Sequence, residues 1–121
     1  MILIVEDEEA LRENMQELLE LSGYEIASTA HGEEALAWLN ANPAPELIIC
    51  DVMMPRMDGM ALLERLKQEE KWALIPFLFL SAKAEKRVQE EGIEKGASLY
   101  MTKPFTHAEL VANIEKLRSS N

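Results

Sequence analysis

The stretch "ELIICDVMMPRMDG", which runs from Glu46 to Gly59, follows an apolar run with an acid. Residues Leu47 to Cys50 have the length and composition of a buried strand, and Asp51 comes directly after them. A loop that contains both proline and glycine, Pro55 to Gly59, comes next. Aspartate often ends a strand as an ordinary turn residue, so the stretch alone predicts the strand and leaves the purpose of its carboxylate open.

Four other apolar blocks share the short length of this run and its enrichment in β-forming residues. The five predicted strands are Ile2 to Val5, Tyr24 to Thr29, Leu47 to Cys50, Ile75 to Leu80, and Leu99 to Met101. Between and after them, apolar residues recur at helical spacing and give four stretches one apolar face each. Those faces are made of Leu11, Met15, Leu18 and Leu19; Ala35, Leu36 and Leu39; Leu62, Leu63 and Leu66; and Leu110, Ile114 and Leu117.

One more helical stretch, Glu85 to Lys95, is the fourth in chain order and carries a much weaker apolar face. Val88 and Ile93 are its only large apolar residues, and Gly92 lies inside it. We therefore expect this helix to be the most loosely attached element of the fold.

The alternation of strands and helices predicts an α/β fold, because right-handed crossovers place helices on both faces of a parallel sheet. With five strands and five helices, the expected architecture is a doubly wound, flavodoxin-like sheet of order 2-1-3-4-5. Ligands of such sheets bind at the carboxyl ends of the strands, at the switch point between the first and the third strand. The length of 121 residues suits one domain over residues 1–121.

The composition restricts the partners and the compartment. Acidic residues outnumber basic ones by 22 to 12, and Arg12 is the only basic residue among the first 55. So negative a surface repels nucleic acid and anionic membranes, and we expect neither to bind this chain directly. No secretory signal is recognisable after Met1, and the single Cys50 suits a reducing compartment. We expect a cytoplasmic protein whose natural small ligand is a cation.

Three acids follow two strands that should be neighbours in the sheet. Glu6 and Asp7 come directly after the first strand, and Asp51 comes after the third. In the order 2-1-3-4-5 their carboxylates meet in one crevice, where each raises the pKa values of the others unless a cation offsets the charge. Oxygen ligands on loops suit Mg²⁺, which accepts one or two carboxylates and keeps several waters. The neighbouring Glu8 and Glu9 are more simply explained as acids that favour the start of a helix.

The fourth and fifth strands also end in polar groups at the same edge. Ser81 follows the fourth strand, and Thr102 and Lys103 follow the fifth. Taken singly, the serine would be interpreted as a helix cap and the lysine as a surface charge. Together with a carboxylate nucleophile and a metal, however, a hydroxyl and an ammonium group complete the parts that phosphoryl transfer requires.

Four motifs, "ILIVEDE", "IICDVMMPRMDG", "FLSAK" and "YMTKPF", occur in the order and spacing of one known family. The chain resembles the receiver domain of two-component response regulators, and the resemblance covers essentially its whole length. It implies that Asp51 accepts a phosphoryl group and that Lys103 pairs with that group. The implied ligands of Mg²⁺ are Asp7, Asp51 and the backbone carbonyl of Met53, with Glu6 acting through a metal-bound water.

The resemblance further implies a conformational switch. Ser81 corresponds to the switch hydroxyl of the family, Tyr100 to its switch aromatic residue, and the Lys103–Pro104 bond to a cis peptide. The phosphoryl group would come from a sensor histidine kinase or a histidine phosphotransfer protein. The chain would be a regulatory domain that catalyses only its own phosphorylation and dephosphorylation. The face of the fourth helix, fifth strand and fifth helix would contact a downstream effector domain or protein.

Several positions depart from the commonest family pattern. Residues 96–100 read Gly-Ala-Ser-Leu-Tyr where many transcription-factor receivers have Gly-Ala-Asp-Asp-Tyr, and Asn113 stands where those proteins often have arginine. We therefore do not expect the salt-bridged activation dimer of that subfamily. Met53 and Lys83 resemble the positions that govern access of hydrolytic water. Because both side chains are long, we expect a phosphorylated form that is not among the shortest lived.

Two other functions are compatible with this fold. Phosphatases of the haloacid dehalogenase type also place an aspartate nucleophile and Mg²⁺ at a strand tip, but they require a second aspartate where this chain has Met53. A pseudo-receiver would be a non-phosphorylated interaction module of the same fold. It would normally lack part of the acidic pocket or the lysine, and this sequence retains both. An assay of phosphomonoester hydrolysis tests for the phosphatase, and incubation with acetyl phosphate and Mg²⁺ separates a receiver domain from a pseudo-receiver.

Overall fold

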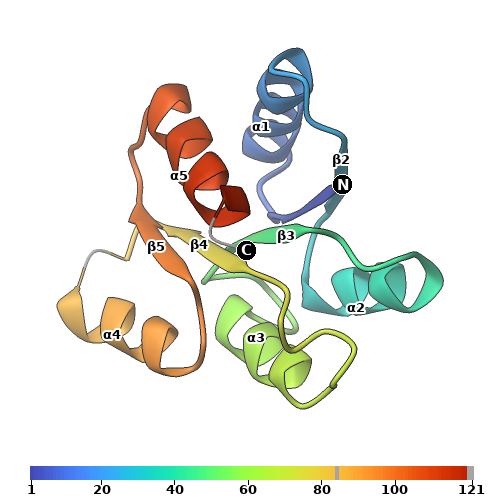
Figure 1. Cartoon of the computed structure of the whole chain (residues 1–121). Coiled ribbons are helices and arrows are strands. Elements are labelled where there is room, and N and C mark those ends of the chain that lie inside the picture. Colours follow the sequence, from blue (N-terminus) through green and yellow to red (C-terminus); the bar gives the residue numbers. More distant parts are fainter. Residues whose placement is uncertain (84, 120–121) are drawn as a thin grey trace.

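The computed structural model describes residues 1–83 and 85–119, and Figure 1 shows their arrangement. Strands and helices alternate along these ranges. The strands are β1 (Ile2–Val5), β2 (Ile26–Thr29), β3 (Leu47–Asp51), β4 (Phe77–Ser81) and β5 (Leu99–Thr102). The helices are α1 (Glu9–Leu21), α2 (Gly32–Ala41), α3 (Gly59–Lys67), α4 (Lys86–Glu94) and α5 (His107–Ser119).

All five strands run parallel in one sheet of order β2-β1-β3-β4-β5. This order confirms the predicted doubly wound fold, with its switch point between β1 and β3. In Figure 1, α1 and α5 cover one face of the sheet, and α2, α3 and α4 cover the other. None of the helices within the described ranges has both the length and the apolar character needed to cross a lipid bilayer.

The strands supply a core to each side of the sheet, because successive side chains point to opposite faces. Ile2 and Ile4 of β1 belong to the same apolar cluster as Ile114 of α5. Leu3 and Val5 belong to the opposite cluster, which includes residues of α2 and α3. All four residues of β1 are completely buried, as expected for a strand that is covered on both faces.

Two strands begin later than the sequence predicts. β2 begins at Ile26 instead of Tyr24, whose amide is hydrogen-bonded within the turn that ends α1. β4 begins at Phe77 instead of Ile75, whose amide closes a turn onto the carbonyl oxygen of Trp72 at 3.1 Å. In both cases a local turn uses backbone groups that apolar composition alone assigns to the strand.

Three strands also end one residue later than predicted. β3 includes Asp51, β4 includes Ser81 and β5 includes Thr102. In the register of the sheet, Asp51 pairs with Leu80, and Ser81 pairs with Thr102. Because the sheet holds the backbone of these three residues, their polar side chains are carried by strands, whereas Glu6, Asp7 and Lys103 lie in the loops that follow β1 and β5.

Candidate functional site

Three carboxylates meet at the carboxyl ends of β1 and β3. Glu6, Asp7 and Asp51 each offer one oxygen atom, and these three atoms lie within 4.8 Å of one another. Glu6 and Asp51 are buried, with 2% and 8% of their surfaces exposed, whereas Asp7 faces solvent. Repulsion among such carboxylates has to be offset, and an all-oxygen donor set that solvent can reach suits a hard divalent cation such as Mg²⁺. The acidic cluster therefore fits a metal ion.

Lys103 reaches this cluster from the loop after β5. Its Nζ atom lies 2.9 Å from Asp51 Oδ2 and 3.2 Å from Glu6 Oε1. Its backbone amide donates a hydrogen bond to the carbonyl oxygen of Ser81 (2.8 Å), which ties the loop to the end of β4. The Lys103–Pro104 peptide bond is cis, as the family resemblance implies. The structure thus brings the lysine and the acids that the sequence singled out into one cluster.

Burial and charge determine the protonation of two groups in this cluster. Burial is the main cause that raises the pKa of Glu6 from 4.5 to about 7; the charge of Asp51 adds to it, while the hydrogen bond from the Glu8 amide and the charge of Lys103 oppose it. For Lys103, burial disfavours the charged form, but the hydrogen bond and the charge of Asp51 outweigh burial and raise its pKa. Near neutral pH, a protonated lysine therefore lies beside a glutamate whose carboxyl group binds a proton more strongly than an exposed glutamate does.

The loop after β3 holds Asp51 in place. The backbone amide of Met53 donates a hydrogen bond to Asp51 Oδ1 (3.2 Å). The chain then turns back, and the amide of Gly59 donates to the carbonyl oxygen of Val52 (2.9 Å). A Cβ atom on Gly59 would lie 2.2 Å from the carbonyl oxygen of Asp51, so only glycine fits at this return. The glycine that ends the motif thus allows α3 to start directly against the aspartate.

Ser81 and Tyr100 both contact Lys83, in the loop between β4 and α4. Ser81 is buried, and its Oγ atom accepts a hydrogen bond from the amide of Lys83 (3.0 Å). The half-buried Tyr100 donates a hydrogen bond from its hydroxyl group to the carbonyl oxygen of Lys83 (2.7 Å). The ring of Tyr100 packs against Phe79, with 5.8 Å between ring centroids. The two hydroxyl groups that the sequence singled out are therefore both hydrogen-bonded to the backbone of Lys83. Sequence reasoning missed these two hydrogen bonds.

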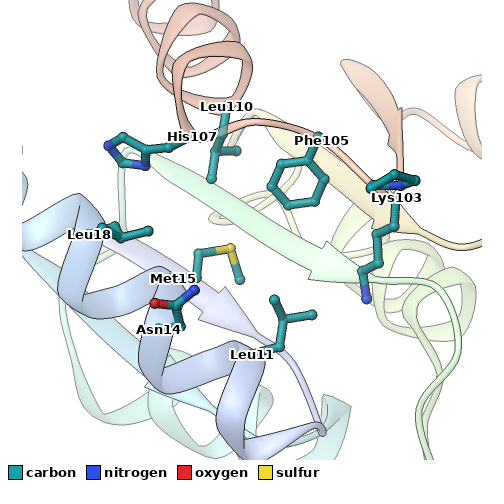
Figure 2. A pocket seen from close by; sticks show the side chains of 9 residues that line it. Leu11, Asn14, Met15, Leu18, Lys103, Phe105, His107 and Leu110 are labelled. Atoms are coloured by element: carbon teal, nitrogen blue, oxygen red, sulfur yellow. The ribbon is translucent and has the colours of Figure 1, made fainter.

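A largely apolar cavity of about 280 Å³ adjoins the site between α1 and α5. Its apolar lining comes from Leu11, Met15 and Leu18 of α1 and from Phe105 and Leu110 around the start of α5. Figure 2 shows Lys103 at one end of the cavity, with its amine directed toward the tip of β3. Helical spacing predicts the apolar face of α1, but it does not show that part of this face stays uncovered beside the site.

The sequence profile of the family described as "Response regulator receiver domain" matches residues 2–115 of the chain. The chain belongs to this receiver domain family. The receiver domain is 40% identical over 116 residues to the "Alkaline phosphatase synthesis transcriptional regulatory protein PhoP" of Bacillus subtilis, with 96% of the receiver domain and 47% of the relative covered. It is 40% identical over 114 residues to the "Phosphate regulon transcriptional regulatory protein PhoB" of Pseudomonas aeruginosa, with 94% and 49% covered. The chain thus spans about half the length of these curated relatives.

Solved structures of receiver domains are similar to this one over nearly the whole chain. A putative response regulator from Chloroflexus aurantiacus has a TM-score of 0.91 at 36% sequence identity, with 98% of this chain and 96% of that chain covered. The chemotaxis response regulator CheY4 of Vibrio cholerae has a TM-score of 0.89 at 28% identity, with 96% of each chain covered. The family and the flavodoxin-like fold that the sequence predicts are thereby confirmed.

Proposed function

We propose that this receiver domain is a phosphorylation-activated switch in which Asp51 accepts a phosphoryl group in the presence of Mg²⁺. The observation that carries the proposal is the convergence of Asp51 with Lys103 and two further carboxylates at one edge of the sheet. In this proposal the ion is bound directly by Asp7, Asp51 and the backbone carbonyl of Met53. Glu6 acts through a metal-bound water.

The proposed chemistry is an in-line displacement at phosphorus. A carboxylate oxygen of Asp51 forms a bond to phosphorus while the bond between phosphorus and its donor atom breaks. The donor atom is the imidazole nitrogen of a phosphohistidine or the acetate oxygen of acetyl phosphate, and it leaves with the bonding electron pair. When bound, Mg²⁺ neutralises charge on the phosphoryl oxygens. Lys103 supplies a second positive charge from its position 2.9 Å from Asp51 Oδ2.

The contacts of Lys83 support a switching role for Ser81 and Tyr100. Phosphorylation adds negative charge and acceptor oxygens at Asp51, and Ser81 offers a hydroxyl donor on the neighbouring strand. Rotation of Ser81 toward the phosphoryl group would break its hydrogen bond with the Lys83 amide. The carbonyl oxygen of Lys83 in the same loop accepts a hydrogen bond from the hydroxyl group of Tyr100. Movement of this loop would therefore alter the face of α4, β5 and α5. We propose this face as the output surface.

A sensor histidine kinase or a histidine phosphotransfer protein is the proposed phosphoryl donor. Any donor has to bring its phosphoryl group to Asp51 over the loops at the carboxyl edge. The apolar cavity beside Lys103 offers a contact surface next to that approach. We therefore expect the donor to bury part of α1 and the start of α5.

The output of the whole protein is also a proposal. The names of the two relatives describe transcriptional regulatory proteins, and the chain spans about half of their length. With 22 acidic and 12 basic residues, the receiver domain itself is poorly suited to bind DNA. We propose that a downstream effector domain or protein carries the output and that the protein acts in the cytoplasm.

Intact mass spectrometry after incubation with acetyl phosphate and Mg²⁺ tests the phosphorylation site. We expect one phosphoryl adduct on the wild type, none on Asp51→Asn, and much slower adduct formation in EDTA. Asp58→Asn is the matched control, because Asp58 lies in the same loop and caps α3 through its side chain (2.9 Å to the Ala61 amide), which asparagine also does. A wild type without an adduct favours the pseudo-receiver, and an adduct that persists on Asp51→Asn assigns the acceptor to another residue.

Two further measurements on the same samples address turnover and lifetime. We expect no sustained hydrolysis of phosphomonoesters, because Met53 occupies the position where a phosphatase of the haloacid dehalogenase type needs its second acid. Sustained hydrolysis that Asp51→Asn abolishes would favour the phosphatase. We also expect the adduct not to be among the shortest lived, because Met53 (57% exposed) and Lys83 are long side chains at positions that resemble those governing access of hydrolytic water in the family.

A further inference from the structure

Arg12 lies beside the acidic cluster and contacts its backbone. It is the only basic residue among the first 55, and it lies in the first turn of α1. Its Nη1 atom donates a hydrogen bond to the carbonyl oxygen of Glu6 at 2.8 Å. Most of the charged residues near Arg12 in the sequence are acids. The acceptor of this hydrogen bond is nevertheless a backbone carbonyl oxygen and not a carboxylate.

The carbonyl group that Arg12 contacts belongs to the peptide bond between Glu6 and Asp7. Peptide bonds are planar, so a contact that fixes the oxygen also fixes the plane from which Asp7 continues. The connection from β1 to α1 is only three residues long, and its last residue, Glu8, makes no side-chain capping hydrogen bond to the helix. The hydrogen bond of Arg12 therefore joins α1 to the segment that carries two of the three acids.

The other contacts of Glu6 hold it from different directions. Its amide donates to the carbonyl oxygen of Thr29 (3.0 Å), and its Oε2 atom accepts from the amide of Glu8 (3.1 Å). Its Oε1 atom lies 3.2 Å from Lys103 Nζ. These contacts fix the backbone amide and the carboxylate of Glu6. Arg12 instead contacts the carbonyl group of Glu6, from which the chain continues to the exposed Asp7.

We propose that Arg12 is a positioning residue of the cation site, whose hydrogen bond to the Glu6 carbonyl preorganises Glu6 and Asp7 to bind Mg²⁺. A guanidinium group suits this task, because it stays protonated and presents several donors in a fixed plane. The inference rests on the proposed function, since it requires that Mg²⁺ binds to the acidic cluster.

Charge alone predicts the opposite effect of removing Arg12. A positive charge near a cation site repels the cation, so its removal should tighten Mg²⁺ binding if Arg12 acted only through space. If Arg12 acts by positioning, its removal loosens the Glu6–Asp7 segment and weakens binding. The direction of the change in Kd therefore distinguishes the two roles.

Isothermal titration of the metal-free receiver domain with Mg²⁺ measures this change. The variants are Arg12→Gln, Arg12→Lys and the control Arg65→Gln, which removes an equal charge from α3, where Arg65 pairs with Glu69 at 2.8 Å. We expect Kd to rise about tenfold in Arg12→Gln, as is common when residues that orient metal ligands are replaced. The rise should be smaller in Arg12→Lys and absent in Arg65→Gln.

Phosphorylation by acetyl phosphate provides a second readout that a purely structural role would not change in the same way. In Arg12→Gln, the Mg²⁺ concentration for half-maximal phosphorylation should rise by the same factor as Kd. The rate at saturating Mg²⁺ should stay near that of the wild type, because Asp51 and Lys103 keep their contact. Circular dichroism checks that each variant is folded, and Arg12→Lys decides the question if Arg12→Gln is not.

The possible failures of the two proposals are distinguishable. A wild type that binds Mg²⁺, combined with an unchanged or lower Kd in Arg12→Gln, overturns the role of Arg12 alone. If Arg12→Gln does not fold, Arg12→Lys is used in its place. A Kd of Arg12→Lys equal to that of Arg65→Gln then overturns the role of Arg12 alone. A wild type that does not bind Mg²⁺ overturns the proposed cation site, and the role of Arg12 with it.

Discussion

The helices α4 and α5 lie on either side of β5, yet they are attached to the sheet in different ways (Figure 1). α5 buries three large apolar side chains, those of Leu110, Ile114 and Leu117. Among the residues of α4, all of which are described, Gly92 alone is buried, and Ile93 is 48% exposed. The free energy of separation follows the buried apolar area, so α4 can leave the sheet at far lower cost than α5.

The contact of α4 with the sheet shows why its attachment is weak. A Cβ atom on Gly92 would lie 3.1 Å from the ring of Phe79, so the backbone of the helix rests almost directly on the strand that ends in Ser81. Such a contact buries little side-chain area, so a small shift of the helix exposes little additional apolar surface. The comparison indicates that α4 is suited to two arrangements of similar free energy, while α5 is suited to stay in place.

The largest expected difference between the two helices concerns a matched pair of isoleucines. Ile114→Ala in α5 should lower the free energy of unfolding by about 3 to 4 kcal/mol, because it leaves a cavity in a fully buried site. Ile93→Ala in α4 should lower it by less than about 0.5 kcal/mol. Urea unfolding of both variants measures these changes, and similar losses in the two would contradict the comparison.

A change of global stability with pH should alter the opening free energies of amides in α5 but not those of amides in α4. The folded-state pKa of Glu6 is raised from 4.5 to about 7, mainly by burial, so its contribution to stability is complete below pH 4.5 and is lost as the pH rises through about 7. In EDTA, the wild type should therefore lose about 2 to 3 kcal/mol between about pH 5 and about pH 8 relative to Glu6→Gln. Urea unfolding at both pH values checks this difference.

The location of that loss sharpens the comparison. Amides of α5 that exchange only on global unfolding should follow the change in global stability, whereas amides of α4 exchange by local opening and should not. A parallel pH response of the two helices, measured as opening free energies, would show that α4 opens only together with the core.

Hydrogen exchange at one pH gives the next largest difference. We expect the amides of residues 90–94 in α4 to have opening free energies at least about 2 kcal/mol below those of residues 111–117 in α5, because few apolar contacts hold α4. Exchange followed by NMR measures both sets in one sample. Equal protection in the two segments would contradict the inference that α4 is the mobile partner.

The smallest expected effect concerns the ion pair that joins α3 to the end of α4. Lys95, just after α4, pairs with Glu64 of α3, and Glu64 is about half exposed. Glu64→Gln should change the free energy of unfolding by less than about 0.5 kcal/mol, because solvent screens such pairs. A loss of several times that size in urea unfolding would show that polar contacts, and not apolar area, hold α4 in place.

The sequence predicted most of the candidate site, because parallel strands bring their carboxyl ends to one edge. The residues at those ends, Glu6, Asp7, Asp51, Ser81 and Lys103, could therefore be grouped before any coordinates were known. The weakly apolar pattern of residues 85–95 also predicted a helix with little buried surface, as the structure shows. Their individual chemical roles rest on the family and on the experiments proposed above.

The sequence by itself determined the strands, the helices and the edge at which the polar residues meet, because polarity patterns are carried by neighbours along the chain. Only the tertiary structure decided which backbone groups those side chains contact. The hydrogen bonds of Arg12 to the Glu6 carbonyl and of Tyr100 to the Lys83 carbonyl are of this kind. Each depends on the position of a carbonyl oxygen that every residue possesses, and hence residue type does not reveal it.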